Sequence, residues 1–163
     1  MKNILSAAIL ASLISLPVFA GSHSGNVRLG IALGFTGPAE SLAASMAAGA
    51  ELAIDEVSKS GLLLGGSKVT SARADSTCVD AAAAASAAER LIASEKVDAI
   101  VGALCSGATI SILQNVAMPN GVVLFSPSAT SPALSTLEDK GYFFRSSPSD
   151  ARQGQVIAEM LVE

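Results

Sequence analysis

The middle of the chain alternates between short apolar runs and a stretch with helical periodicity. Ala99–Leu104 is an apolar run without polar alternation, which predicts a strand buried on both faces of a sheet. A segment with apolar residues every three or four positions opens at Cys105 and ends at Pro119-Asn120-Gly121, as a helix would. Val122–Phe125 is a second apolar run. A strand–helix–strand unit of this length predicts two parallel strands.

The same alternation continues on both sides of this unit. Gly61 is placed to end one helix, Asp80 to cap another, and Asp150 with Gln153 to start the last. Five strands alternating with helices predict an α/β fold with a doubly wound parallel sheet in the order 2-1-3-4-5. The other expected elements are strands at Val27–Gly34, Lys68–Ala74 (an edge) and Tyr142–Ser146, helices at Glu40 to about Lys59, about Val79–Ser94 and Ala151–Val162, and a turn or short helix at Ser131–Ser135.

Small hydroxyl residues follow both strands of the central unit. Ser106 comes after the first strand and opens the helix, while Ser128-Ala129-Thr130 follows the second strand. Both turns lie beyond the carboxyl ends of parallel strands, where open α/β sheets bind ligands. The two turns predict an anion-sized binding pocket without a general base. Ser106 is equally suited to a helix cap, and Ser-Pro-Ser-Ala-Thr is a common turn composition, so the residue types alone leave both interpretations open.

Composition narrows the function classes. The chain of 163 residues has a formal net charge of −4 and no basic cluster, which argues against binding to nucleic acid, DNA included, and to anionic membranes. The motifs G-x-S-x-G, H-E-x-x-H, the P-loop and G-x-G-x-x-G are missing. His23 is the single histidine and lies far from the hydroxyl turns. The sequence therefore predicts neither an enzyme nor a cofactor or metal site.

The N-terminal segment has the pattern of a secretory signal peptide. Lys2 precedes an uncharged apolar run from Ile4 to Val18, and Val18-Phe19-Ala20 places small residues at the cleavage positions. We expect residues 1–20 to be removed on export to the periplasm, with an uncleaved anchor as the alternative. Residues 21–26 are then a flexible leader, and the sheet domain occupies residues 27–163.

Two cysteines, Cys78 and Cys105, remain in the exported part of the chain. An even number of cysteines in an oxidising compartment favours a structural disulfide, which would stabilise the fold by about 3 kcal/mol. The alternative, a Cys105 nucleophile, would need a histidine partner that the chain does not place nearby.

Several stretches resemble a known family: IALGFTGP, ADSTCVD, IVGALCSGAT, PNGVVLFSPSATSPAL and FFRSSPSDARQGQ. They are similar to the substrate-binding proteins of branched-chain amino acid ABC transporters, the leucine/isoleucine/valine-binding type. The resemblance implies a type I periplasmic-binding fold of two α/β lobes, with transporter permease subunits as partners. Residues 27–163 would form the first lobe, and the second lobe would be absent from a truncated chain, which also ends abruptly in a helix at Glu163.

The resemblance also implies roles for individual residues. Ser106 would offer its hydroxyl and backbone N–H to the ligand's α-carboxylate. Thr130 would offer its N–H to the carboxylate and its hydroxyl to the α-ammonium, and the Ser128 carbonyl would accept from the ammonium. The family's acidic partner for the ammonium would come from the second lobe. Leu104, Cys105 and Ala129 would form the apolar wall of the ligand pocket. The resemblance also implies a Cys78–Cys105 disulfide, which occurs in some members of the family.

Leu42 stands where the branched-chain binders commonly place an aromatic residue. The expected ligand is therefore the broader class of an amino acid, an amide or a small carboxylate. Two other functions remain open from the sequence: a ligand-sensing receptor domain of the same fold, and a truncated lobe without useful binding.

Overall fold

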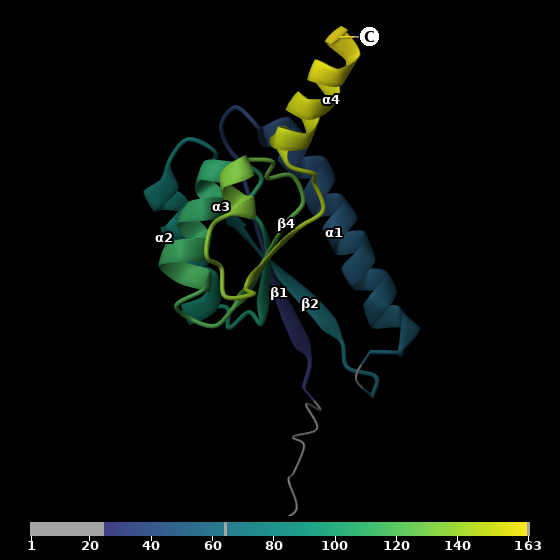
Figure 1. Cartoon of the computed structure of the whole chain (residues 1–163). Helices are drawn as coiled ribbons and strands as arrows, with labels where there is room; N and C mark the ends of the chain where they lie inside the picture. The colour runs from purple at the N-terminus through teal and green to yellow at the C-terminus, as the bar shows by residue number, and fades with distance from the viewer. Residues whose placement is uncertain (1–24, 64, 163) are drawn as a thin grey trace, which may run out of the picture.

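Alternating strands and helices build a five-stranded parallel sheet with helices on both faces (Figure 1). The structure is a computed structural model that describes residues 25–63 and 65–162. The predicted signal peptide, residues 1–20, and residues 21–24 of the predicted leader lie outside the described residues. The strands are β1 (Val27–Leu33), β2 (Val69–Asp75), β3 (Ala99–Gly102), β4 (Val123–Ser126) and β5 (Phe143–Arg145). The helices are α1 (Glu40–Ser60), α2 (Ala81–Ala93), α3 (Ser106–Ile112) and α4 (Asp150–Val162), with short helical turns η1 (Leu113–Ala117) and η2 (Pro132–Ser135).

The sheet order is β2-β1-β3-β4-β5, which confirms the predicted 2-1-3-4-5 topology. Every neighbouring pair of strands is parallel, with Leu29 of β1 opposite Ala99 of β3 and Val101 of β3 opposite Phe125 of β4. All five strands therefore end at the same edge of the sheet, and the loops after β1, β3 and β4 meet there.

Local signals set most helix boundaries. Gly61 ends α1 in the left-handed conformation (φ 67°), and the Asp80 carboxylate caps α2 by accepting from the N–H groups of Ala82 and Ala83 at 2.9 Å. Both boundaries are as predicted. The helix after Cys105 differs from the expected single helix, because its second half, η1, widens into a π-helical turn.

Gly102 allows β3 to approach β1 closely. Its φ is 153°, and a Cβ added to it would collide with the backbone of Ala32 on β1. Only glycine fits this position without a shift of one strand. Gly102 is the last residue of β3, so this close contact lies directly before the loop that carries Cys105 and Ser106.

The larger part of the core lies between the sheet and the layer formed by α2 and α3, where Leu91, Ile100, Ile112 and Leu124 are fully or almost fully buried. A smaller cluster lies under α1, around Ile31 and Leu33.

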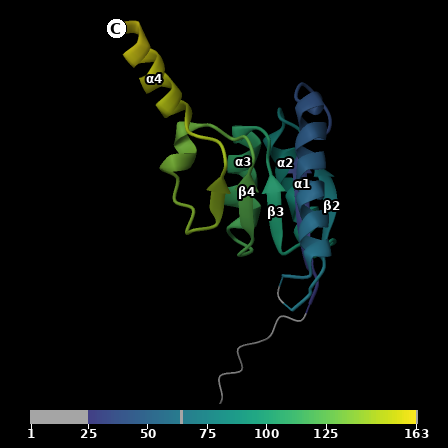
Figure 2. The same ribbon diagram turned by 90° about the vertical axis from the view of Figure 1, so that its right-hand side faces the viewer.

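The prediction that Ala99–Leu104 is buried on both faces is wrong for the face of β3 that lies on the side of α1. Ala99 and Val101 are only partly buried there. The reason is that α1 lies over β1 and β2 and leaves β3 and β4 open on that face (Figure 2).

The last helix, α4, has no buried residue and projects away from the sheet (Figures 1 and 2). Its start differs from the predicted capping box. The Ser149 hydroxyl accepts from the N–H of Ala151 at 3.3 Å, while the Asp150 side chain is bonded to Thr130. Within residues 25–63 and 65–162, no helix is both long enough and apolar enough to cross a membrane.

Candidate functional site

The two hydroxyl turns predicted from the sequence meet at the carboxyl edge of the sheet. Ser106 is the first residue of α3, and its Oγ accepts a hydrogen bond from the N–H of Ser131 at 3.2 Å. Ser131 directly follows the Ser128–Thr130 turn. Ser106, Ser128 and Thr130 are each partly exposed, so their polar groups remain accessible from the edge.

Two serine side chains fix the turn after β4 against the end of β3. The buried Ser126 hydroxyl donates to the carbonyl of Ala103 at 2.7 Å and accepts from the N–H of Ala129 at 2.9 Å. The Ser128 hydroxyl donates to the carbonyl of Leu104 at 2.8 Å. These bonds join the turn after β4 to main-chain carbonyls at the end of β3, and so they fix the two turns relative to each other.

Arg145, at the end of β5, braces the same turn from the other side. Its Nη1 donates to the carbonyls of Ala129 and Ser131 at 3.1 and 3.0 Å, and its Nη2 donates to the Ser135 hydroxyl at 2.6 Å. The sequence interpretation placed Arg145 in a strand without a role. The sequence does show an arginine at the carboxyl end of a predicted strand, at the edge where the site lies. It does not show that this arginine contacts the turn after β4, because that contact depends on the folded position of the turn.

Asp150 is a second site residue that sequence reasoning missed. Its carboxylate accepts from the Thr130 hydroxyl at 2.9 Å, and its N–H donates to the Thr130 carbonyl, also at 2.9 Å. Asp150 is exposed, so this carboxylate lies at the surface beside a hydroxyl that the resemblance assigns to a ligand ammonium. The sequence showed Asp150 only as the start of a helix.

The three residues expected to form an apolar wall differ in exposure. Ala129 is fully buried and Leu104 nearly so, because they belong to the two core clusters, and Cys105 is partly exposed. A disulfide joins Cys105 to Cys78, as expected, with 5.4 Å between the Cα atoms. The bridge ties the loop before α2 to the residue that precedes Ser106.

The loop after β1 forms the neighbouring part of the edge, and Asp75 at the end of β2 holds it. The Asp75 carboxylate accepts from the N–H groups of Phe35 at 3.0 Å and Thr77 at 2.9 Å and from the Thr36 hydroxyl. Desolvation on its own would raise the pKa of Asp75. The hydrogen bonds from Thr36, Thr77 and Phe35 together outweigh it, and the pKa lies below its usual value.

This lowered pKa predicts a specific acid sensitivity. The ionised Asp75 stabilises the fold fully above the unfolded-state pKa, near 3.8, and this contribution is lost as the pH falls through the lower pKa of the folded state. In Asp75→Asn the free energy of unfolding should therefore fall less steeply with decreasing pH below about 3.8 than in the parent. At pH 7 the variant should be less stable than the parent. Urea unfolding followed by circular dichroism between about pH 2.5 and 7 measures both effects. Asp139→Asn, a change at another aspartate, is the control, and equal slopes for parent and Asp75→Asn would contradict the assignment.

The carboxyl edge of the sheet can bind a ligand through hydrogen bonds. It offers hydroxyls, backbone N–H groups at the start of α3, and one exposed carboxylate. Across residues 25–63 and 65–162, no group of three or more His, Cys, Asp or Glu side chains is arranged to hold a metal ion.

A sequence model of the periplasmic binding protein family matches residues 26–163, which is most of the chain. The chain belongs to the periplasmic binding protein family. Among curated members, the Leu/Ile/Val-binding protein BraC3 of Rhizobium johnstonii is 30% identical over 159 residues, 98% of this chain and 41% of the relative. The Leu/Ile/Val-binding protein homolog 1 of Brucella abortus is 32% identical over 162 residues, 99% of this chain and 42% of the relative.

Solved structures of family members share the fold. The branched-chain amino acid transporter substrate binding protein LivJ of Streptococcus pneumoniae, in complex with isoleucine, superposes with a TM-score of 0.69 at 31% identity over 77% of this chain and 34% of its own. The leucine binding protein LivK of Thermotoga maritima gives a TM-score of 0.70 at 29% identity over 81% of this chain and 35% of its own. These relatives are binding proteins. This chain spans less than half the length of each relative named here.

Proposed function

We propose that this chain is the first lobe, residues 27–163, of an extracytoplasmic substrate-binding component of an ABC transporter. It captures an amino acid or a related small carboxylate for uptake, works in the periplasm with transporter permease subunits, and does not transform its ligand. The observation that carries the proposal is that the two hydroxyl turns lie at one edge of the sheet, where the Ser131 N–H donates to the Ser106 hydroxyl.

The α-carboxylate of the ligand is placed at the start of α3. The first N–H groups of a helix have no intrahelical acceptor, so those of Ser106 and Gly107 are available to a carboxylate. The Ser106 hydroxyl already accepts from Ser131 through one lone pair, and its own proton remains available for donation. The Thr130 N–H completes the set from the opposite turn.

The ammonium of the ligand is placed between Thr130 and the Ser128 carbonyl. The Thr130 hydroxyl donates to Asp150, so its oxygen can accept a hydrogen bond from the ammonium. Asp150 adds a negative charge on the same side. The first lobe therefore supplies one carboxylate of its own, in addition to any acid that a second lobe contributes.

The names of the relatives support the ligand class. BraC3 and the Brucella homolog are named Leu/Ile/Val-binding proteins, and the LivJ structure holds isoleucine. Leu42, at the edge, is more than half exposed and gives the rim an aliphatic residue in place of an aromatic one. We extend the relatives' ligands to the broader class of amino acids, amides and small carboxylates for this reason.

The test uses a two-lobed chimera. Residues 25–163 are joined to the C-terminal part of BraC3, which lies outside the matched 41% of that protein. Binding of each of the twenty amino acids is then measured by calorimetry. For the ligand that binds, Ser106→Ala and Thr130→Ala should each raise Kd by roughly ten- to a hundredfold, because hydrogen bonds to charged groups contribute about 1.5–3 kcal/mol. Thr130→Ala should lie at the upper end, since losing its hydroxyl also leaves the ligand ammonium short of an acceptor.

Two exposed residues provide matched controls. Thr136→Ala and Ser86→Ala remove a hydroxyl outside the edge, at η2 and on α2, and should leave Kd unchanged. Thermal melting of every variant separates binding from folding. If both site variants bind as tightly as the parent and only melt earlier, Ser106 and Thr130 serve as a cap and a turn, and the proposed site is wrong.

A further inference from the structure

The guanidinium of Arg145 carries a positive charge that no neighbouring carboxylate neutralises. It donates to three neutral oxygens, which are the carbonyls of Ala129 and Ser131 at 3.1 and 3.0 Å and the Ser135 hydroxyl at 2.6 Å. Among residues 25–63 and 65–162, no Asp or Glu side chain forms an ion pair with it. Arg145 is only partly exposed, so water and salt screen its charge incompletely. The charge therefore acts on the polar groups of the turn after β4.

The Ala129 carbonyl connects this charge to the backbone N–H of Thr130. The two groups belong to one planar peptide unit, so a donor on the carbonyl draws electron density away from the N–H. In a chain of hydrogen bonds each bond strengthens the next by roughly 10–30%, and a charged donor has about twice the effect of a neutral one. The Thr130 N–H is therefore a stronger donor than an ordinary backbone amide.

The Thr130 N–H is also available to a ligand. The other two polar groups of Thr130 are bonded to Asp150, its carbonyl to the Asp150 N–H and its hydroxyl to the Asp150 carboxylate, both at 2.9 Å. The N–H has no acceptor within the part of the chain that the structure describes, and Thr130 is partly exposed. The Ser131 carbonyl offers Arg145 no second route of this kind, because the next residue, Pro132, has no N–H.

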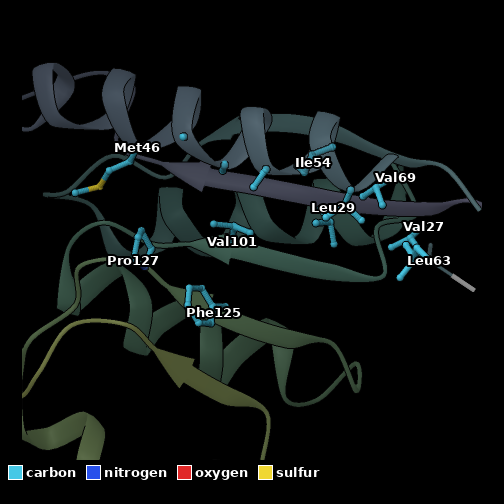
Figure 3. A pocket seen from close by; sticks show the side chains of 13 residues that line it. Val27, Leu29, Met46, Ile54, Leu63, Val69, Val101, Phe125 and Pro127 are labelled. Atoms are coloured by element: carbon cyan, nitrogen blue, oxygen red, sulfur yellow. The ribbon is translucent and has the colours of Figure 1, made fainter. Parts of the chain in front are cut away.

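Two charges of opposite sign thus act on different groups of one residue. Arg145 acts on the Thr130 N–H through a peptide unit, and Asp150 acts on the Thr130 hydroxyl directly. The chain before the turn adds no further charge. Pro127 lines a pocket beside α1 whose lining residues are all apolar (Figure 3).

We propose that Arg145 is a positioning residue that makes binding depend on the negative charge of the ligand carboxylate. It holds the Ala129–Thr130 peptide unit in place and strengthens its N–H donor. This inference rests on the proposed function, which places the carboxylate at that N–H. An ionised carboxylate gains from the stronger donor and from the nearby positive charge. A neutral amide in the same place gains much less, because its oxygen carries less charge.

The first measurement needs no ligand and uses nuclear magnetic resonance of the full chain. Arg145→Gln should move the Ala129 carbonyl carbon resonance and the Thr130 amide nitrogen resonance upfield, because a hydrogen bond to the carbonyl deshields both nuclei. Arg152→Gln removes the same charge from an exposed position on α4 and is the matched control, with both resonances unchanged. Resonances that stay in place in Arg145→Gln would overturn the inference and would leave the proposed function intact.

The second measurement compares L-leucine with L-leucinamide by calorimetry, in the two-lobed chimera and at about pH 6.5, where both ligands carry an ammonium. If another amino acid binds more tightly than leucine, that amino acid and its amide are the pair. Arg145→Gln should raise Kd for the acid roughly three- to tenfold and for the amide less than about twofold. Arg145→Lys keeps the charge and should retain most of the preference for the acid. Arg152→Gln should leave both Kd values unchanged.

The outcomes separate the two proposals. Equal losses for acid and amide in Arg145→Gln would mean that Arg145 only maintains the shape of the turn, which overturns the inference while the proposed function stands. If Arg145→Gln does not fold, the parent and Arg145→Lys decide, and a preference for the acid below about twofold in either one overturns the inference. A parent chimera that binds no amino acid overturns the proposed function and the inference with it.

Discussion

Gly102→Ala is expected to remove a large part of the stability of the fold. The new Cβ would meet the backbone of Ala32 on the adjacent strand, and alanine would have to adopt a φ of 153°. Backbone strain of this kind and overpacking each cost about 1–3 kcal/mol, so together they should lower the free energy of unfolding by about 4 kcal/mol. Since domains of this size are stable by only about 5–15 kcal/mol, the loss is severe.

Gly107→Ala is the matched control for this experiment. A Cβ at Gly107 meets nothing within 4 Å, and the residue lies inside α3, where alanine is favoured by up to about 1 kcal/mol. Urea unfolding followed by circular dichroism should show the two variants moving in opposite directions. Equal stability of Gly102→Ala and the parent would mean that β1 and β3 can separate at this point without cost.

Removing the disulfide should have the next largest effect on stability. The bridge closes a sequence separation of 27 residues, for which the chain-entropy model gives about 3.5 kcal/mol. The double variant Cys78→Ser, Cys105→Ser should therefore unfold at lower urea, and the reduced parent should match it. Reductant should have no further effect on the double variant. A parent whose unfolding midpoint is unchanged after both thiols have been freed would contradict this expectation.

Most helix boundaries could be predicted because their causes are local, and the strand order followed from the alternation of strands and helices along the chain. Helical periodicity, the left-handed Gly61 and the Asp80 cap each act within a few residues. The exposure of Val101 and Phe125 could not be predicted in the same way. An apolar run indicates a strand in a buried sheet, but it does not tell which face lacks a covering helix, since that depends on where α1 and α4 lie.

For the candidate site, sequence reasoning found the residues of the two turns but missed those that hold them. Ser106 and Thr130 stand directly after predicted strands, so parallel topology is enough to bring them to one edge. Arg145 and Asp150 act on the turn from 14 to 20 residues away, through bonds to carbonyls and to one hydroxyl. Such partners depend on strand register and on side-chain reach, and neither is encoded in a local pattern.

The two hydrogen bonds between Thr130 and Asp150 join the candidate ligand position to the first residue of helix α4. Because α4 is about 20 Å long, a tilt of about 10° at its first residue would displace its last residue by about 3–4 Å. A ligand ammonium that competes for Asp150 acts at this pivot. On the proposed function, ligand binding at the edge would therefore change the direction in which α4 leaves the lobe.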